Sequence, residues 1–363
     1  MTSSPLTDLH SPTRADALND ALERLADYRY LDGPGFACHG PMAAEALSSL
    51  GYHHEVAGWV ERYKASHPPI PAPPTNTPVD LTSTESWRQA LGDASRISDW
   101  AVAFRHELAD APWRTVLTRW AARLLPGYAG SLTHGLLRVA HGARALSTSG
   151  QPSPLMLDEL ARGLAMWAAT FVRLPGRFPL EGDLSLEQAL ARLPRPTSPW
   201  SPIETGTFTR ISELVEFSAR VGALQPPPST NDALAHLSET FCRIIDANPD
   251  IFPVPLVHTV TPVAAMRTLI PYLPGIPLDN LYAQIWQVNA AIITGFTPES
   301  MQLHADVHVT ESPSPAEVAA IAVEHGDAHV IKFADAATRE HASHPASAYL
   351  YAAQSVWQRV PRL

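Results

Sequence analysis

The sequence predicts an all-α fold, a single large helical-bundle domain with proline-rich surface loops. Apolar residues recur at the three- and four-residue spacing of an amphipathic helix along nearly the whole chain. The 363 residues are 45% hydrophobic and include nine tryptophans, enough to bury one large core. Clean strand-like alternation occurs only over residues 302–309, and one isolated strand does not make a sheet.

The helical spacing is clearest in four segments, taken here in chain order. They are the segments around Leu18, Leu22 and Leu25, around Val116, Trp120, Ala121 and Leu124, around Leu160, Leu164, Trp167 and Phe171, and around Ile285, Val288 and Ile292. Proline suits the first turn of a helix, so we expect helices to begin at Pro41 and Pro112. Residues 1–14 are expected to form a flexible N-terminal tail, and residues 15–363 the helical domain.

The prolines also mark the loops between the expected helices. Of the 35 prolines, many fall in three short segments, residues 67–78, 194–202 and 225–229. These segments are too short to be disordered tethers between domains, so they are interpreted as rigid surface connections. The first is a candidate lid over an apolar, aromatic pocket.

Composition excludes several classes of function. The net charge of −10, with acidic and basic residues interspersed, argues against a nucleic-acid surface and against a polybasic membrane anchor. Cys38 and Cys242 are too few and too far apart for a disulfide framework. A signal peptide and a membrane-spanning apolar run are not evident, so we expect a cytoplasmic protein. Motifs for nucleotide phosphates, for a serine nucleophile elbow and for a zinc protease are lacking as well.

The pair His329 and Lys332 is the first candidate for chemistry. Lys332 is one of only two lysines among the 26 basic residues, and the i, i+3 spacing places both side chains on one face of a helix. Such a pair can bind a metal or position a base. The alternative is that His329 caps a helix near Asp327 while the Lys332 amine reaches solvent.

Four histidines lie inside, or at the start of, otherwise apolar helices: His39, His134, His258 and His329. A single inward histidine is most often a core residue bonded to a carbonyl or hydroxyl. Four in one helical protein favour a metal site, because bundles build such sites from facing helices and imidazole suits iron, zinc and copper. Spacing alone leaves open whether the four converge.

Four motifs, in this order, resemble the questin oxidase-like family: HGPMAAEAL (39–47), HGLLRVAH (134–141), VHTVTP (257–262) and DAHVIK (327–332). The resemblance implies an all-helical enzyme related to fungal oxygenases, which open an anthraquinone ring in a Baeyer–Villiger-like step at a non-haem metal. Carried over by motif, the metal ligands are His39, His134, His258 and His329, with Lys332 beside them. Fungal relatives carry a further histidine and a tyrosine where this chain has Arg138 and His141, a departure that bears on the substrate.

The role of Lys332 has two interpretations. Neutral histidines leave a ferrous ion with its full charge, so an anionic ligand would support a higher oxidation state. A neutral, buried Lys332 amine can add carbon dioxide and become a carboxylated ligand. Alternatively Lys332 stays an ammonium that binds an anionic substrate, with Glu45 or Asp327 as its counter-charge.

Glu45, Arg138 and His141 are the candidate catalytic residues around the metal. His141 follows His134 by seven residues, about two turns, so both face the same side, where His141 would act as an acid or base. It could equally bond a loop carbonyl. Arg138 and Arg144 could bind phenolate or carboxylate oxygens, although arginines usually pair with a nearby Glu or Asp.

One rival metal motif is the alternating run of His304, Asp306 and His308, which is more typical of a solvated hairpin or lid. The remaining histidines in polar or proline-flanked surroundings are assigned to the surface: His53, His54, His67, His341 and His344.

The sequence therefore predicts a mononuclear non-haem iron (Fe²⁺) oxygenase that uses dioxygen on an aromatic, polyketide- or anthraquinone-like small molecule. Whether NADPH serves as reductant, and which oligomer forms, stay open. One alternative is a metal-free helical protein that binds a hydrophobic ligand, and another is a zinc-dependent hydrolase or lyase.

Overall fold

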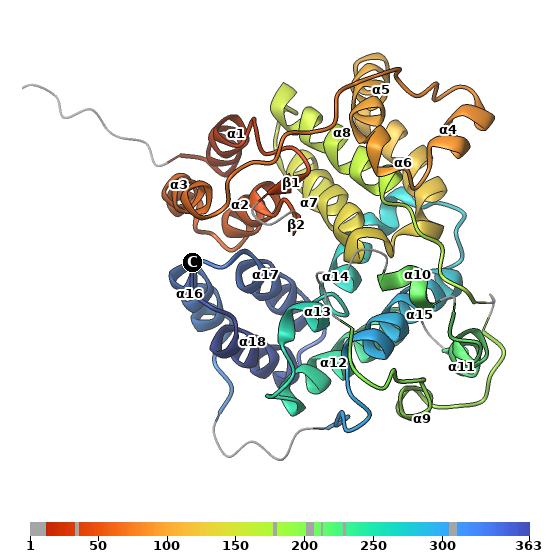
Figure 1. The fold of residues 1–363 in the computed structure, drawn as a ribbon. Coiled ribbons are helices and arrows are strands. Elements are labelled where there is room, and N and C mark those ends of the chain that lie inside the picture. Colours follow the sequence, from red (N-terminus) through yellow and green to blue (C-terminus); the bar gives the residue numbers. More distant parts are fainter. Residues whose placement is uncertain are drawn as a thin grey trace, which may run out of the picture.

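The computed structural model describes residues 12–32, 36–176, 180–200, 207–211, 213–227, 230–304 and 311–363. The all-α prediction is confirmed, since helices joined by short loops form one compact domain (Figure 1). The described residues also contain one small antiparallel pair that the sequence did not predict, β1 (Leu31–Asp32) and β2 (Phe36–Ala37). No helix in the described part of the chain combines the length and the apolarity needed to cross a membrane.

The first half of the chain contributes the helices coloured red to yellow in Figure 1. They are α1 (Arg14–Arg24), α2 (Gly40–Ser49), α3 (Val56–Ser66), α4 (Thr84–Ala90), α5 (Ile97–Asp110), α6 (Trp113–Leu124), α7 (His134–Thr148) and α8 (Pro154–Ala169), with 3₁₀ turns η1 (His53–Glu55), η2 (Ala94–Arg96), η3 (Leu125–Gly127) and η4 (Gly130–Thr133).

The second half contributes the helices coloured green to blue. They are α9 (Leu186–Ala191), α10 (Thr207–Ile211), α11 (Phe217–Gly222), α12 (Thr230–Ala247), α13 (Pro253–Val257), α14 (Thr261–Leu269), α15 (Leu278–Phe296), α16 (Pro315–His325), α17 (Ala328–Ser343) and α18 (Ser347–Arg359), with a 3₁₀ turn η5 (Ile270–Tyr272).

The expected helices are all present, with differences at their ends. Pro41 lies in the first turn of α2, and Pro112 is the N-cap of α6. Phe171 lies two residues beyond the end of α8. Helix α1 begins at Arg14, the last residue of the predicted tail, with a capping box in which the Thr13 side chain accepts from the Asp16 backbone N–H, and residues 1–11 of that tail lie outside the described residues. The strand-like run 302–309 lies mostly outside the described residues.

Helices from the two ends of the chain pack against each other and against helices from the middle of the chain. Helix α17, close to the C-terminus, packs against α2, while α14 packs against both α7 and α17 (Figure 1). Helices α7 and α8 approach closely at Gly135, where a Cβ atom would lie 2.5 Å from the Cα of Trp167. A larger residue there would push α7 away from its neighbour, so this glycine fixes the position of the histidine just before it.

The proline-rich segment 67–78 is a surface connection, as predicted. It is held to its surroundings by hydrogen bonds: the Ser98 hydroxyl donates to the Pro73 carbonyl at 2.5 Å, and the Asn76 N–H donates to the Asp99 carboxylate at 2.8 Å. These contacts fasten the segment to the start of α5.

Candidate metal centre

Three of the four predicted histidines place a ring nitrogen in one small volume. One ligand atom from each of His39, His134 and His329 lies within 4.8 Å of the other two. The Nε2 atoms of His39 and His134 are 2.8 Å apart, and the rings of His39 and His329 have centroids 4.4 Å apart. Two nitrogens bound to one ion at about 2.1 Å are roughly 3.0–3.4 Å apart, so only small shifts would let them share a metal.

His258 lies beside this group on the His134 side. Its ring centroid is 4.6 Å from that of His134 and 6.2 Å from that of His329. Its Nε2 atom is buried and has no hydrogen-bond partner among the described residues. A buried imidazole nitrogen without a partner is unfavourable, and a metal ion at the cluster would satisfy it.

Three of the four histidines share a structural position, because each lies where a helix begins. His39 is the N-cap of α2, His134 is the first residue of α7, and His329 is the second residue of α17. His258 ends α13 and precedes the first residue of α14 by three positions. The cluster therefore receives the partial positive charge of several helix N-termini, which favours neutral imidazole over imidazolium.

The chain reaches His134 through an unusual backbone. Ser131, Leu132 and Thr133 all have φ between 48° and 69°, the left-handed region that residues with a side chain rarely occupy. Gly130 precedes them, and a Cβ atom there would lie 1.4 Å from the Thr170 carbonyl oxygen. Three such residues in succession beside buried histidines are a local strain of the kind that collects at functional sites.

Three of the histidines have a polar partner at Nδ1, which leaves Nε2 as the nitrogen available to the cluster. His134 Nδ1–H donates to the Ser131 carbonyl at 2.6 Å, so its Nε2 carries a lone pair. His258 Nδ1 and Thr133 Oγ1 share a hydrogen bond of 3.3 Å. His329 Nδ1 lies 3.5 Å from the Asp327 carboxylate, which also caps α17 by accepting from the backbone N–H of His329. Such outer contacts orient metal-binding imidazoles.

His39 is held through its backbone. Its N–H donates to the Tyr63 hydroxyl oxygen at 3.0 Å, and that hydroxyl donates to the Asp32 carboxylate. Tyr63 comes from α3 and Asp32 from β1, so the small strand pair contributes to placing this ligand. Stacking of the Tyr63 ring on Trp59 and on His67 fixes the phenol.

The electrostatics of the cluster favour unprotonated nitrogen. Burial lowers the pKa of His39, His134 and His258 well below the usual value, and the charge of Lys332 lowers all three further. Burial also lowers the pKa of Lys332 to about 7, and its Nζ has no hydrogen-bond partner among the described residues. Neutral nitrogen is the form that binds a metal, so the donor set fits a transition-metal ion.

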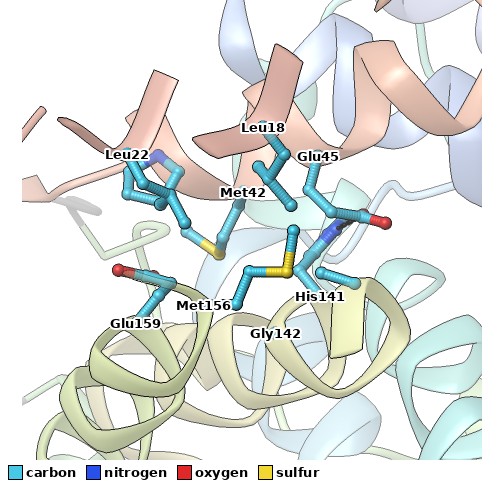
Figure 2. Close-up of a pocket in the computed structure, with 10 residues that line it drawn as sticks. Leu18, Leu22, Met42, Glu45, His141, Gly142, Met156 and Glu159 are labelled. Atoms are coloured by element: carbon cyan, nitrogen blue, oxygen red, sulfur yellow. Dashed lines mark hydrogen bonds and ion pairs between the residues drawn. The ribbon is translucent and has the colours of Figure 1, made fainter. Parts of the chain in front are cut away.

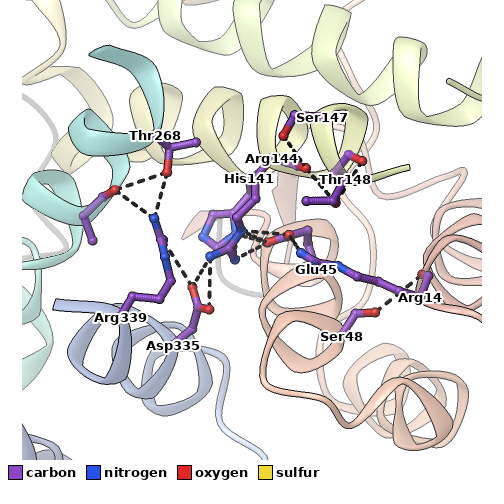
Figure 3. A network of polar contacts seen from close by, with 12 residues as sticks. Arg14, Glu45, Ser48, His141, Arg144, Ser147, Thr148, Thr268, Asp335 and Arg339 are labelled. Carbon is purple, nitrogen blue, oxygen red and sulfur yellow. Dashed lines mark hydrogen bonds and ion pairs between the residues drawn. The ribbon is translucent and has the colours of Figure 1, made fainter. Parts of the chain in front are cut away.

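The predicted acid–base residues form a separate network (Figure 3). Glu45 accepts from Arg14 at 2.6 Å, from His141 Nδ1 at 2.7 Å and from Arg144, and Arg144 in turn donates to Asp335 at 2.8 Å. Burial alone would raise the pKa of Glu45, but the charge of Arg144 and the His141 hydrogen bond lower it below its usual value. His141 therefore bonds a carboxylate and not a loop carbonyl, which was one of the two expectations for it.

Arg138 is fully buried. It makes a bidentate ion pair with Glu159, at 2.6 and 2.8 Å, and donates to the Arg29 carbonyl. These contacts join the guanidinium to protein groups on both sides. Arg138 therefore pairs with a nearby glutamate, as the alternative interpretation expected, and is not placed to bind a substrate oxygen.

Two small cavities border this network. One lies between Leu18, Met42, Met156 and the Glu45–His141 pair, with a volume of about 10 Å³ (Figure 2). The other has about 20 Å³ and is lined by His141, Arg144 and Lys332, among others. Each holds about one water molecule, so neither is the roomy aromatic pocket that the sequence led us to expect.

The other histidines mostly lie at the edge of the molecule. His54 is exposed, and His53, His341 and His344 are half-buried. His67 was assigned to the surface too, but it stacks on Tyr63 with ring centroids 4.4 Å apart and adds to the lowering of the pKa of His329, so it lies near the cluster. In the rival motif, Asp306 and His308 lie outside the described residues.

Sequence reasoning did not find the residues that orient the histidines, namely Asp32, Tyr63, Ser131 and Thr133. Asp327 was considered as a counter-charge for Lys332 and as the neighbour of a capping His329, whereas the Asp327 side chain is itself the cap of α17 and faces His329. The aspartate two residues before a histidine at a helix start is a signal that would have suggested this role.

Comparisons with known proteins add no relative: the chain matches no protein-family model and no curated protein. The resemblance to the questin oxidase-like family, described above from four short motifs, stays a prediction.

Proposed function

We propose that this chain is a metal-dependent oxygenase with a mononuclear non-haem iron centre at His39, His134, His258 and His329. The observation that carries the proposal is the convergence of imidazole nitrogens from the buried His39 and His134 and the half-buried His329, all within 4.8 Å of one another, with the unpartnered Nε2 of His258 beside them. The four ordered motifs around these histidines resemble those of aromatic-ring oxygenases. This resemblance supports dioxygen and an aromatic, polyketide- or anthraquinone-like molecule as the substrates.

The iron would supply the redox chemistry that dioxygen needs, and the chain supplies its position and surroundings. Ser131 and Asp327 hold the rings of His134 and His329 in the tautomer that directs Nε2 inward. The burial of His39 and His258 excludes bulk water, which strengthens electrostatic interactions at the centre and protects reactive species.

Lys332 would complete the centre in one of two ways. Lys332 is 4% exposed, its amine has no partner in the described part of the chain, and its charge lowers the pKa of all four histidines. As a neutral amine it can be carboxylated and act as an anionic ligand. As an ammonium it would bind a phenolate oxygen of the substrate. We favour the ligand role, because Glu45 is already engaged by Arg14, His141 and Arg144, and because burial outweighs the charge of Asp327 and lowers the pKa of Lys332 to about 7.

Metal analysis and oxygen consumption test the proposal. The protein, purified and loaded with ferrous iron without air, is expected to retain one iron per chain after gel filtration. It should then consume dioxygen only when a hydroxyanthraquinone or a similar polycyclic phenol is added, and runs with and without NADPH identify the reductant. Retention of zinc in place of iron, with hydrolysis of an aryl ester and no oxygen uptake, would favour the hydrolase alternative. A protein that retains no metal would contradict both.

The substitution Lys332→Arg tests the ligand role of the amine. Arginine keeps the positive charge and the approximate length but stays protonated, so it neither binds a metal nor becomes carboxylated. We expect loss of iron or of turnover, with the far-ultraviolet circular dichroism unchanged. Arg substitution of the other lysine, Lys64→Arg, is the matched control and should have no effect. Full iron content and full turnover in Lys332→Arg would exclude the ligand role.

A further inference from the structure

Three helices present matching stripes of residues to one narrow interior seam. The cavity of about 20 Å³ is lined by Leu137, Ala140, His141 and Arg144 of α7, by Thr261, Ala264, Ala265 and Thr268 of α14, and by Lys332, Asp335, Ala336 and Arg339 of α17. Within each set the residues follow the spacing i, i+3, i+4, i+7, which is one face of a helix over two turns, or about 10 Å.

The same three stripes, extended back by one turn, reach the histidines. His134 precedes Leu137 by three residues, His258 precedes Thr261 by three, and His329 precedes Lys332 by three. The N-terminal ends of α7, α14 and α17 meet at the histidine cluster, so the seam between the helices runs from that cluster toward their C-terminal ends.

The two ends of the seam differ in character. At the inner end lies Lys332, 4% exposed, whose Nζ lacks a partner among the described residues. At the outer end Arg144 pairs with Asp335 at 2.8 Å, and Arg339 donates to the Thr268 hydroxyl at 2.9 Å. The Arg339 side chain is 34% exposed, so this end reaches the surface.

Small residues keep the middle of the seam open. Ala140, Ala264, Ala265 and Ala336 provide the wall between the two polar ends, and all four are buried. The volume is enough for one molecule of the size of water, and the polar groups at either end would give it hydrogen-bond partners.

We propose that this seam is the passage by which water-sized molecules, dioxygen among them, reach the metal centre, with the Arg144–Asp335 and Arg339–Thr268 contacts as its outer closure. The inference rests on the metal centre of the proposed function but not on the chemistry catalysed there. A passage of this width admits diatomic and triatomic molecules and excludes an aromatic substrate, which must reach the centre by another route.

Blocking variants in the middle of the seam test the passage. Ala336→Val on α17 adds two methyl groups to its wall, and Ala140→Val places the same block on α7 in case the first variant does not fold. Ala337→Val is the matched control, because Ala337 is the next residue of α17, equally buried, and does not line the cavity. Circular dichroism and cobalt content select the variants that are folded and loaded.

The measurement is azide binding to the cobalt(II)-loaded protein, followed by stopped-flow absorbance. A block along the path slows entry and exit alike, so we expect the association and dissociation rate constants to fall together, by about tenfold or more, with Kd unchanged. Ala337→Val should leave both rate constants as in the wild type.

Unchanged rate constants in a folded blocking variant, or a rise in Kd with an unchanged dissociation rate constant, would overturn the passage. If the wild-type protein bound no cobalt, the metal centre itself would be wrong, whereas loss of oxygenase activity alone would leave the passage standing.

Discussion

The histidine cluster and the ion-pair network occupy the same helices but differ in how their polar groups are satisfied. Helix α7 carries His134 at its start and Arg144 near its end, and α17 carries His329 and Asp335 in the same order. In the network, Arg144 contacts two carboxylates, Glu45 and Asp335, so each buried charge has an opposite charge beside it.

The cluster has less of this compensation. It gathers imidazoles and one amine, and the Asp327 carboxylate lies at its edge, 3.5 Å from His329 Nδ1. Two of its nitrogens, His258 Nε2 and Lys332 Nζ, have no partner among the described residues. Buried polar groups that satisfy one another hold the fold together, whereas buried nitrogens that outnumber the acids beside them are suited to receive a cation. Substitutions should therefore have opposite effects in the two regions.

Removing a histidine should affect metal binding and leave folding intact. His134→Ala deletes the ring whose Nε2 lies 2.8 Å from that of His39, and we expect the iron content and the activity to be lost completely. Because the ring is a metal ligand at the first residue of α7 and not part of the apolar core, the helical content should stay near that of the wild type. His341→Ala, at a half-buried position later in α17, is the control. Normal iron content in His134→Ala would contradict the assignment of this ring as a ligand.

Removing the central arginine of the network should do the reverse. Arg144→Met leaves Glu45 and Asp335 buried with their main partner gone, and breaking a buried pair in this way lowers the free energy of unfolding by about 3–5 kcal/mol. Urea denaturation measures the change. Arg24→Met, which breaks exposed pairs with Asp20 and Glu61, should leave it nearly unchanged. The molecules of Arg144→Met that remain folded should still bind iron, and loss of iron from them would mean that the two regions are one site.

Helix geometry explains why sequence reasoning found the histidines but misplaced their neighbours. His141 faces the same side of α7 as His134, as predicted, but seven residues along a helix span about 10 Å. Glu45 is displaced from His39 by a similar length of α2. The two side chains therefore meet each other, 2.7 Å apart, one level away from the metal ligands. A shared helix face is visible in a sequence, whereas the height at which two helices cross is not.

The fold class was predictable because a helix leaves a local pattern in the sequence. Apolar periodicity indicates the helices, and the prolines in their first turns indicate where they begin. The contacts of Tyr63 with Asp32 and His39 join α3, β1 and α2, and no local pattern in the sequence indicates such long-range pairing. The left-handed backbone before His134 is equally invisible, because Ser131, Leu132 and Thr133 are not residues that favour it.

The hydroxyl of Tyr63 offers a smaller perturbation of the cluster. Tyr63→Phe removes the acceptor of the His39 N–H and keeps the ring that stacks on Trp59. Loss of an outer contact of this kind lowers metal affinity by about 10- to 100-fold. Competition with a metal-binding dye measures it. Tyr28→Phe, on a buried tyrosine whose hydroxyl donates to the Lys64 carbonyl, is the control. An unchanged metal affinity in Tyr63→Phe would show that His39 needs no support from the hydroxyl.

The smallest expected effect is a pH dependence that only the cluster should confer. Burial lowers the pKa of Lys332 to about 7, below the usual value of 10.5, so between these two values the unfolded chain binds more protons than the folded one. The stability of the metal-free protein should therefore rise with pH above 7, by about 1.4 kcal/mol per pH unit at most. Urea denaturation between pH 7 and pH 8, a range in which the cysteine thiols of the unfolded chain stay mostly protonated, measures the slope. Lys332→Met has no group to titrate and should lose this contribution, whereas Lys64→Met, at the other lysine of the chain, should keep it.

The guanidinium of Arg144 stays charged throughout, so the network contributes no slope here. An equal slope in wild type and Lys332→Met would mean that the amine is in contact with water.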